Sequence, residues 1–142
     1  MLFRSPEATG RRYRAVASAS ALWHDGRTFV GTRDALCALV SPDGRTYSLG
    51  NAAAYGPVRC VCTNAEKTEL WGVAGDDEDM GYVFRYDDEN GLRQLGILNY
   101  DSKGFYLPSA SNILSSICLS PDEKTLAIGG ADRLGTVHVI DL

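Results

Sequence analysis

The sequence lacks several features that would point to a particular biochemical class. It has no long apolar run, so it predicts no membrane-spanning helix, and its first residues contain no apolar segment of signal-peptide length. Its net charge is −4, which disfavours nucleic acid and anionic membrane as partners because both require a basic surface. We therefore expect a cytoplasmic protein with no nucleic-acid or membrane partner.

Metal and redox motifs are also missing. There are 4 cysteines, but none forms a C-x-x-C pair, and no histidine lies at a metal-ligand spacing. Cys60 and Cys62 lie two apart in a strand-like run, so they share a face, and on alignment with the last repeat they fall at Ile117 and Leu119. We interpret them as small hydrophobic core residues. A thiol metal site or a redox pair is the alternative, and we expect no cofactor.

Catalytic motifs are equally scarce. The only histidines are His24, in a turn-like segment, and His138, in a strand-like run, and neither accompanies a serine or cysteine in a nucleophile motif. No glycine-rich phosphate loop follows a strand and opens a helix. The sequence therefore names no catalytic residue and favours a non-enzymatic role.

What the sequence does contain is a strand pattern. Short runs rich in Val, Ile, Leu, Tyr and Thr recur, separated by Asp-Gly, Pro-Asp and Asn-Gly turns, and no stretch shows a helical period of helix length. Glycine is abundant at 15 residues. This pattern is typical of an all-β protein with hairpin turns.

The strand runs group into three similar units. In each unit a polar turn leads to a threonine (Thr28, Thr68 or Thr125), an apolar strand, a polar loop with Asp and a second apolar strand. Internal similarity at roughly 40 to 50 residues indicates four-stranded propeller blades. The single domain then divides into blades at about 13–50, 57–98 and 112–142, preceded by an arm at 1–12.

One stretch carries a family resemblance. The segment "LSPDEKTLAIGGADRLGTVHVIDL" resembles the repeat of YVTN-type and WD40-like β-propellers, in which a Ser-Pro-Asp-Gly turn, an apolar strand and a loop precede a strand ending in Ile-Asp. Ser120, Pro121 and Asp122 match the turn, and Glu123 replaces its glycine. The Gly-His and Trp-Asp signatures of strict WD40 blades are absent. The resemblance implies β-propeller blades in an incomplete ring of about three.

The last blade has no outer strand in the sequence, because the chain ends at "VIDL". An exposed third strand is a sticky edge that requires cover. Leu2–Ser5 could supply a strand by exchange between the termini. Alternatively, two copies complete one ring by self-association, or the chain is part of a longer propeller that contains the missing blades.

Irregular loops are expected to gather on one face, where ligand binding on a rigid scaffold usually occurs. Aromatic and amide side chains in two of these loops suit a protein or carbohydrate ligand, although packing between blades is an alternative. The acidic loop "GDDEDM" is a solvated loop, a calcium site or a contact for a basic partner. Paired Arg and Asp residues recur in matching loops of two blades. The ligand-binding candidates are Arg33, Tyr55, Asp76, Asp77, Asp79, Tyr100, Phe105, Tyr106, Asn112 and Arg133.

Three functions remain open from the sequence. The first is a non-enzymatic module that binds a protein or carbohydrate through the long-loop face. The second is part of a propeller enzyme, of polysaccharide lyase or glycoside hydrolase type, whose catalytic residues lie mostly outside this chain. The third is a structural module whose role is assembly.

Overall fold

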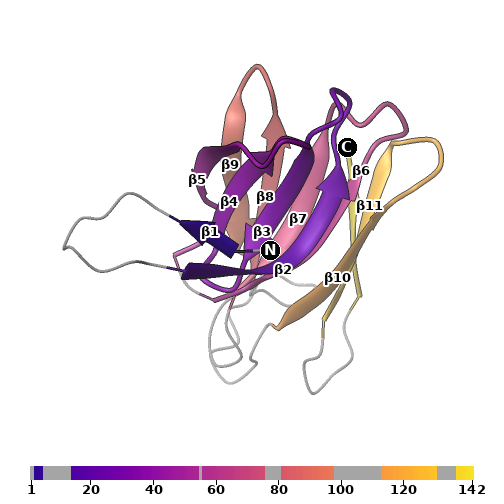
Figure 1. The fold of residues 1–142 in the computed structure, drawn as a ribbon. Helices are drawn as coiled ribbons and strands as arrows, with labels where there is room; N and C mark the ends of the chain where they lie inside the picture. Colours follow the sequence, from indigo (N-terminus) through magenta and orange to yellow (C-terminus); the bar gives the residue numbers. More distant parts are fainter. Residues whose placement is uncertain (1, 5–13, 55, 76–80, 98–112, 131–136) are drawn as a thin grey trace.

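The computed structural model describes residues 2–4, 14–54, 56–75, 81–97, 113–130 and 137–142, and these form an all-β fold (Figure 1). Neighbouring strands within each sheet are antiparallel, and none of the three sheets closes on itself. The strands are β1 Leu2–Arg4, β2 Arg14–Leu22, β3 Thr28–Thr32, β4 Leu36–Val40, β5 Thr46–Asn51, β6 Val58–Thr63, β7 Leu70–Ala74, β8 Tyr82–Asp87, β9 Gly91–Ile97, β10 Leu114–Leu119, β11 Thr125–Gly130 and β12 Val137–Asp141.

Each sheet corresponds to one predicted repeat. The first blade has the strand order β1-β2-β3-β4-β5, the second β6-β7-β8-β9 and the third β10-β11-β12. The fold class predicted from the sequence is therefore confirmed. Within the described part of the chain, β12 pairs with β11 alone and no fourth strand completes the third blade.

The second blade lies between the other two. Its inner strand β6 lies beside β2 of the first blade and beside β10 of the third. Ser18 on β2 donates a hydrogen bond of 2.7 Å from its hydroxyl to the carbonyl of Val58 on β6. The inner strands therefore carry much of the contact between blades.

Five short turns lie at one end of the blades, the upper end in Figure 1, which is called the tight-turn end below. They follow β2, β4, β6, β8 and β10, and they use the turn chemistry expected from the sequence. Glu123, which stands where the repeat pattern has glycine, has a φ of 60°, in the left-handed region that favours glycine. The resemblance therefore identified a position that requires this backbone conformation.

Large side chains fill the space between the first two blades. Phe29 and Phe84 are fully buried and stack with ring centroids 6.3 Å apart. A Cβ added at Gly72 would lie 2.2 Å from the ring of Phe84, so only glycine lets this ring lie flat on β7. A second cluster, which includes Trp71, Val73, Leu126 and Ile128, lies between the second and third blades.

The strand register corrects one prediction. Cys62 pairs with Trp71 in the second blade, as Cys118 pairs with Ala127 in the third. Cys62 therefore corresponds to Cys118, and Cys60 to Ser116; the alignment that placed Cys60 and Cys62 at Ile117 and Leu119 was wrong by one residue. A shift of one residue moves a side chain to the other face of the sheet.

The sequence alone did not decide which blade the segment Leu2–Ser5 joins. Leu2–Arg4 pairs antiparallel with Arg14–Val16 at the beginning of β2. In this chain the segment therefore extends the first blade instead of completing the third. Within the described ranges, the chain forms no helix with the length and apolar character needed to cross a membrane.

Candidate functional site

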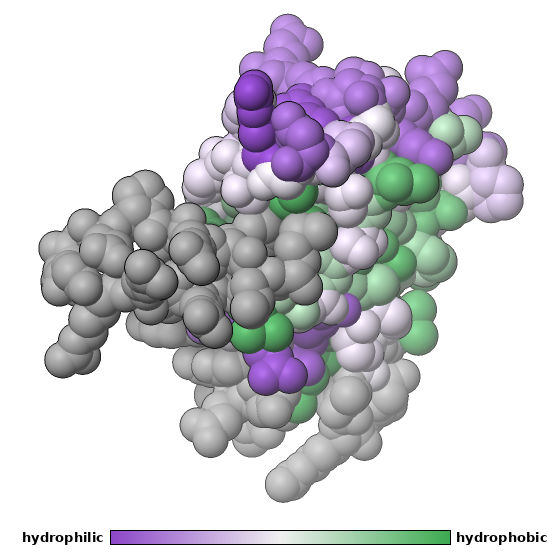
Figure 2. Space-filling model, viewed as in Figure 1, coloured by the Kyte–Doolittle hydropathy of each residue, from purple (hydrophilic) through white to green (hydrophobic). Residues whose placement is uncertain are grey.

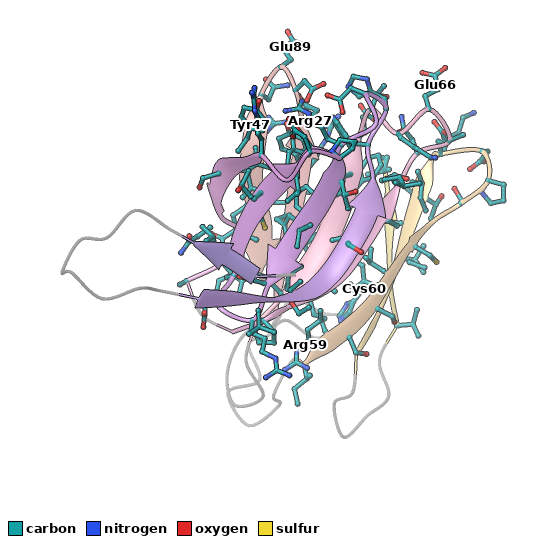
Figure 3. All side chains as sticks on the ribbon, viewed as in Figure 1. Arg27, Tyr47, Arg59, Cys60, Glu66 and Glu89 are labelled. Atoms are coloured by element: carbon teal, nitrogen blue, oxygen red, sulfur yellow. The ribbon has the colours of Figure 1, made fainter. Side chains whose placement is uncertain are left out.

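The tight-turn end of the molecule is rich in hydrophilic residues. Figure 2 shows hydrophilic residues gathered at this end and hydrophobic ones lower on the right flank. Arg27, Tyr47, Glu66 and Glu89 lie at this end, whereas Arg59 lies near the opposite end (Figure 3). The polar side chains at this end connect the first two blades.

Asp88 is the centre of this connection. It lies in the turn after β8, and its Oδ1 accepts hydrogen bonds from the indole Nε1 of Trp23 at 3.1 Å and from the hydroxyl of Tyr86 at 2.9 Å. Its Oδ2 lies 2.5 Å from Nε2 of His24. Trp23 and His24 belong to the turn after β2, so one carboxylate joins the first blade to the second.

These contacts change the acidity of the groups involved. Burial raises the pKa of Asp88, but the hydrogen bonds from His24, Tyr86 and Trp23 outweigh burial and hold the pKa below its ordinary value. Burial, together with the hydrogen bond to Asp88, raises the pKa of the Tyr86 phenol. At neutral pH the network therefore contains a carboxylate and a protonated phenol.

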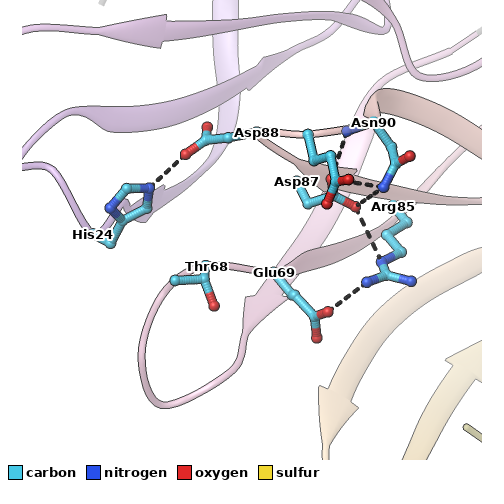
Figure 4. A pocket seen from close by; sticks show the side chains of 8 residues that line it. His24, Thr68, Glu69, Arg85, Asp87, Asp88 and Asn90 are labelled. Atoms are coloured by element: carbon cyan, nitrogen blue, oxygen red, sulfur yellow. Dashed lines mark hydrogen bonds and ion pairs between the residues drawn. The ribbon is translucent and has the colours of Figure 1, made fainter.

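A cavity of about 420 Å³ opens beside this network (Figure 4). On one wall Arg85 donates to Glu69 at 2.5 Å, and its guanidinium carbon lies 5.6 Å from the centre of the Trp71 ring. On another wall the backbone and side-chain nitrogens of Asn90 donate to Asp87 at 2.7 and 3.1 Å. The lining residues are His24, Thr68, Glu69, Arg85, Asp87, Asp88, Glu89 and Asn90.

The polar groups that line this cavity bind one another and so serve to hold the structure together. Asp88 binds three side chains, Glu69 binds Arg85, and Asp87 binds Asn90 and lies 3.6 Å from Arg93. Among the residues that the structure describes, no group of three or more His, Cys, Asp or Glu side chains could hold a metal ion. Of these contacts, those of Asp88 with Trp23 and His24 join the second blade to the first, and the others lie within the second blade. Among the described residues the buried Nε of Arg85 has no hydrogen-bond partner.

The outward face of the third blade is the second notable surface. The register pairs Cys118 with Ala127 and Ala127 with Val139, so these three side chains share a face. Leu126 and Ile128 lie on the opposite face and are buried against the second blade. On the outward face Val137 and Val139 are 64% and 67% exposed. They lie on β12, which has one edge unpaired within the described part of the chain.

Most of the residues predicted as a ligand site lie outside the described residues. Arg33 is described, and it is exposed in the loop between β3 and β4. This loop is at the end opposite the tight turns, as predicted. The others are Tyr55, Asp76, Asp77, Asp79, Tyr100, Phe105, Tyr106, Asn112 and Arg133.

The cavity at the tight-turn end was missed by the sequence reasoning. The segment "YDDEN" at 86–90 is unusually rich in hydrogen-bond acceptors for a turn. That composition was the available signal. The partners Trp23 and His24 lie more than sixty residues away in the chain, so only the packing of two blades reveals the connection.

Comparison with known proteins gives a structural match without a sequence match. No family model matches the sequence, and no curated protein matches it. The chain is similar to the solved β-propeller domain of Cps50 (Swd1) from Myceliophteria thermophila, with a TM-score of 0.58 and 14% identity. The match covers 95% of this chain and 50% of that one, so the chain spans about half the length of that domain.

The strand order, the stacking of the sheets and the similarity to the solved domain all indicate the same fold. Three antiparallel sheets follow one another in chain order, and each packs on the next through its inner strand. The chain therefore has the fold of a WD40-like β-propeller, as an incomplete ring of about three blades.

Proposed function

We propose that this chain is a non-enzymatic β-propeller module that works by binding a protein partner. The observation that carries the proposal is the outward face of the third blade, where Val137 and Val139 are more than half exposed beside a strand edge that no other described strand pairs with. Large apolar side chains gathered beside free backbone donors and acceptors are typical of surfaces that another polypeptide covers.

The polar cavity favours a structural role over a catalytic one. His24 is hydrogen-bonded to Asp88, and the hydroxyl of Thr68, which also lines the cavity, accepts from Asn64 at 2.9 Å. A general base requires a nucleophile or substrate within hydrogen-bond reach. Asp88 instead holds Trp23 and Tyr86 in place, which is a role in stability.

A ligand on the long-loop face remains a separate prediction of the sequence. Aromatic residues there would stack on a sugar ring or a peptide. The triple substitution Tyr55→Ala, Tyr100→Ala and Tyr106→Ala tests it without altering the third blade.

The experiment for the proposed function compares immobilised chains for the proteins and polysaccharides that they retain. The unmodified chain is compared with Val137→Lys/Val139→Lys, with the triple tyrosine variant, and with Leu95→Lys as a control on β9, where Leu95 is 52% exposed. We expect protein partners to be lost only with the two valine substitutions. Equal retention of every protein by all four chains, or a retained polysaccharide and no protein, would contradict the proposal.

A further inference from the structure

Asn90 is the only asparagine in the sequence that is followed by glycine. The backbone nitrogen after an asparagine can attack the carbonyl carbon of the asparagine side chain. Glycine obstructs this attack least, because it has no Cβ and reaches the widest range of backbone conformations. The pair Asn90-Gly91 is therefore the place where an asparagine side chain of this chain can react most readily with its own backbone.

The hairpin between β8 and β9 requires this glycine. Asp87 pairs with Gly91 in the strand register, so the loop between them consists of residues 88–90. A loop of this length is typically closed by a residue in the left-handed region, and Gly91 has a φ of 72°. A Cβ added at Gly91 would meet nothing within 4 Å, so backbone conformation and not crowding selects glycine here. The residue that closes the turn therefore also makes Asn90 open to attack.

In the folded chain Asp87 holds the side chain of Asn90, which is exposed to solvent. Nδ2 of Asn90 donates to Oδ1 and Oδ2 of Asp87 at 3.1 and 3.3 Å, and the backbone nitrogen of Asn90 donates to Oδ1 at 2.7 Å. Figure 4 shows the Asn90 amide directed at this carboxylate. Attack by the nitrogen of Gly91 requires the side chain to turn toward the following residue. The two hydrogen bonds of Nδ2 must therefore break before the reaction.

Asp87 remains an acceptor over a wide range of pH. It is 8% exposed, and the guanidinium groups of Arg85 and Arg93 lie 3.8 and 3.6 Å from its Oδ2. Burial raises the pKa of Asp87, but the hydrogen bonds from Asn90 and the charges of the two arginines outweigh burial and hold the pKa below its ordinary value. The carboxylate is therefore ionised at the neutral and alkaline pH at which asparagine side chains react.

We propose that Asn90 is a site of spontaneous deamidation, and that its hydrogen bonds to Asp87 restrain the reaction in the folded chain. The nitrogen of Gly91 forms a bond to the side-chain carbonyl carbon of Asn90, and the bond from that carbon to Nδ2 breaks. Nδ2 leaves as ammonia with the proton of the Gly91 nitrogen. Water then opens the cyclic imide at either carbonyl, which gives aspartate or isoaspartate, and nothing is oxidised or reduced. The site is separate from the outward face of the third blade, so it does not depend on the proposed function.

Deamidation should weaken the contact between the first two blades. It replaces an amide that donates to Asp87 with a carboxylate that cannot donate, and it adds a negative charge beside Asp88. Isoaspartate also lengthens the backbone by a methylene group inside the loop that joins β8 to β9. Asp88, in the same loop, accepts hydrogen bonds from Trp23 and His24 of the first blade. A change in this loop therefore reaches the groups that hold the two blades together.

The first test measures the rate of deamidation in the full chain, incubated at pH 8 and then digested with trypsin. Cleavage after Arg85 and Arg93 releases Asn90 in the peptide 86–93, in which mass spectrometry detects the change from amide to acid. We expect the folded chain to react roughly tenfold or more slowly than the same chain in urea, because two hydrogen bonds must first break. Equal rates in the two conditions would overturn the proposed role of Asp87.

Two other asparagines are internal controls for the location of the site. Asn51 and Asn64 precede alanine, and the same digest releases them in the peptides 46–59 and 60–67. In urea, where the fold has no influence, we expect Asn90 to react several times faster than either, because the Cβ of the following alanine obstructs the attack. If Asn90 reacted no faster than these two in urea, the assignment of the site would be wrong.

Substitution of Asp87 tests the restraint directly. Asp87→Ala removes the acceptor, so we expect the rate in the folded chain to rise severalfold toward the rate in urea. Glu89→Ala, which removes the same charge from an exposed side chain of the same turn, is the matched control and should leave the rate nearly unchanged. Circular dichroism verifies folding, and if Asp87→Ala does not fold, Asp87→Asn replaces it. That variant keeps one acceptor oxygen, so we expect a smaller increase. An unchanged rate in the folded Asp87 variant would overturn the inference.

The effect on the blades is tested by ageing the chain. We expect the urea midpoint of the unmodified chain to fall as the deamidated fraction of the peptide 86–93 rises. Asn90→Ser has no side-chain amide to lose and changes an exposed residue, so its midpoint should stay constant over the same incubation. Equal falls in both chains, or a constant midpoint in a fully deamidated chain, would contradict the expected weakening of the contact between the blades.

Discussion

The second and third blades have the same strand arrangement but bury equivalent positions very differently. Val83 and Val137 occupy the same place in β8 and β12, yet Val83 is 3% exposed and Val137 is 64% exposed. Leu70 and Leu126, also equivalent, are both buried, at 0% and 1%. The difference is therefore largest on the face that looks toward the next blade.

This comparison shows that a blade is stabilised mainly by its neighbours. The hydrogen-bonded ladder is present in both blades, but among the residues that the structure describes only the second has blades on both faces and a fourth strand on its edge. Burial of apolar area is the dominant favourable term in folding, so the same residue contributes differently in the two places. The predictions below test this difference.

The largest effect is expected at Phe84. Replacement by alanine leaves a cavity above Gly72 and removes the stacking on Phe29, so we expect the free energy of unfolding to fall by about 3–5 kcal/mol. His138 is the equivalent residue of the third blade and is only half-buried. For His138→Ala we expect the free energy of unfolding to fall by less than about 1 kcal/mol. Urea denaturation measures both, and equal losses would contradict the comparison.

The equivalent valines allow a test with identical chemistry. Val83→Ala should lower the free energy of unfolding by about 2 kcal/mol, because a buried valine loses its contacts. Val137→Ala should change it by no more than about 0.5 kcal/mol in the monomer. The measurement is urea denaturation at a concentration where the chain is monomeric. A large loss at Val137 would show that the outward face is already covered.

The hydrogen bonds of Asp88, which connect the first two blades, should contribute less to the free energy of unfolding. Asp88→Ala leaves the indole N–H of Trp23 without its partner, and we expect a loss of about 1–2 kcal/mol, reduced by the partial exposure of the carboxylate. Glu89→Ala, an exposed neighbour in the same turn that removes the same charge, is the control and should be close to neutral.

The pH dependence of this effect has a definite sign. The pKa of Asp88 is lower in the folded chain than in the unfolded chain, so the ionised carboxylate stabilises the fold above the ordinary value of about 4. That contribution is lost as the pH falls through the folded-state pKa. The difference between Asp88→Ala and the unmodified chain should therefore shrink in acid. A difference that grows in acid would contradict the assignment.

The last comparison concerns chemical access. Burial raises the pKa of the Cys62 thiol to about 12, whereas the equivalent Cys118 is exposed. The thiolate is the reactive form, so at pH 8 Cys118 should react with iodoacetamide roughly tenfold or more faster than Cys62 in the monomer. In urea the two rates should converge. Mass spectrometry of the labelled peptides measures both, and equal rates in the native chain would show that the second blade opens readily.

Some elements of the fold were predictable from local chemistry. The turn after β4 contains Pro42, Asp43 and Gly44, and Gly44 has a φ of 88° as a turn glycine requires. The strands followed from runs of β-branched and aromatic residues. The one-residue error at Cys60 and Cys62 arose because the repeats were aligned on Thr68 and Thr125. The register makes Leu70 equivalent to Leu126, so Glu69, not Thr68, corresponds to Thr125.

The candidate surfaces were less predictable. The exposed third blade was anticipated from the missing fourth strand. The connection through Asp88 was not, because its partners come from a distant turn that only the stacking of blades brings near. Of the predicted long-loop residues, the structure describes only Arg33, so the binding role of that face stays a prediction.

By itself the sequence determined the strands, the turns and the repetition, because these depend on backbone preferences and on contacts a few residues apart. The tertiary structure decided which face of each strand is buried, which turns meet across blades and which surface remains open. Those outcomes depend on whether another sheet lies alongside, as the 3% and 64% exposures of Val83 and Val137 show. The local pattern of an apolar strand is the same in both cases, and the neighbour makes the difference.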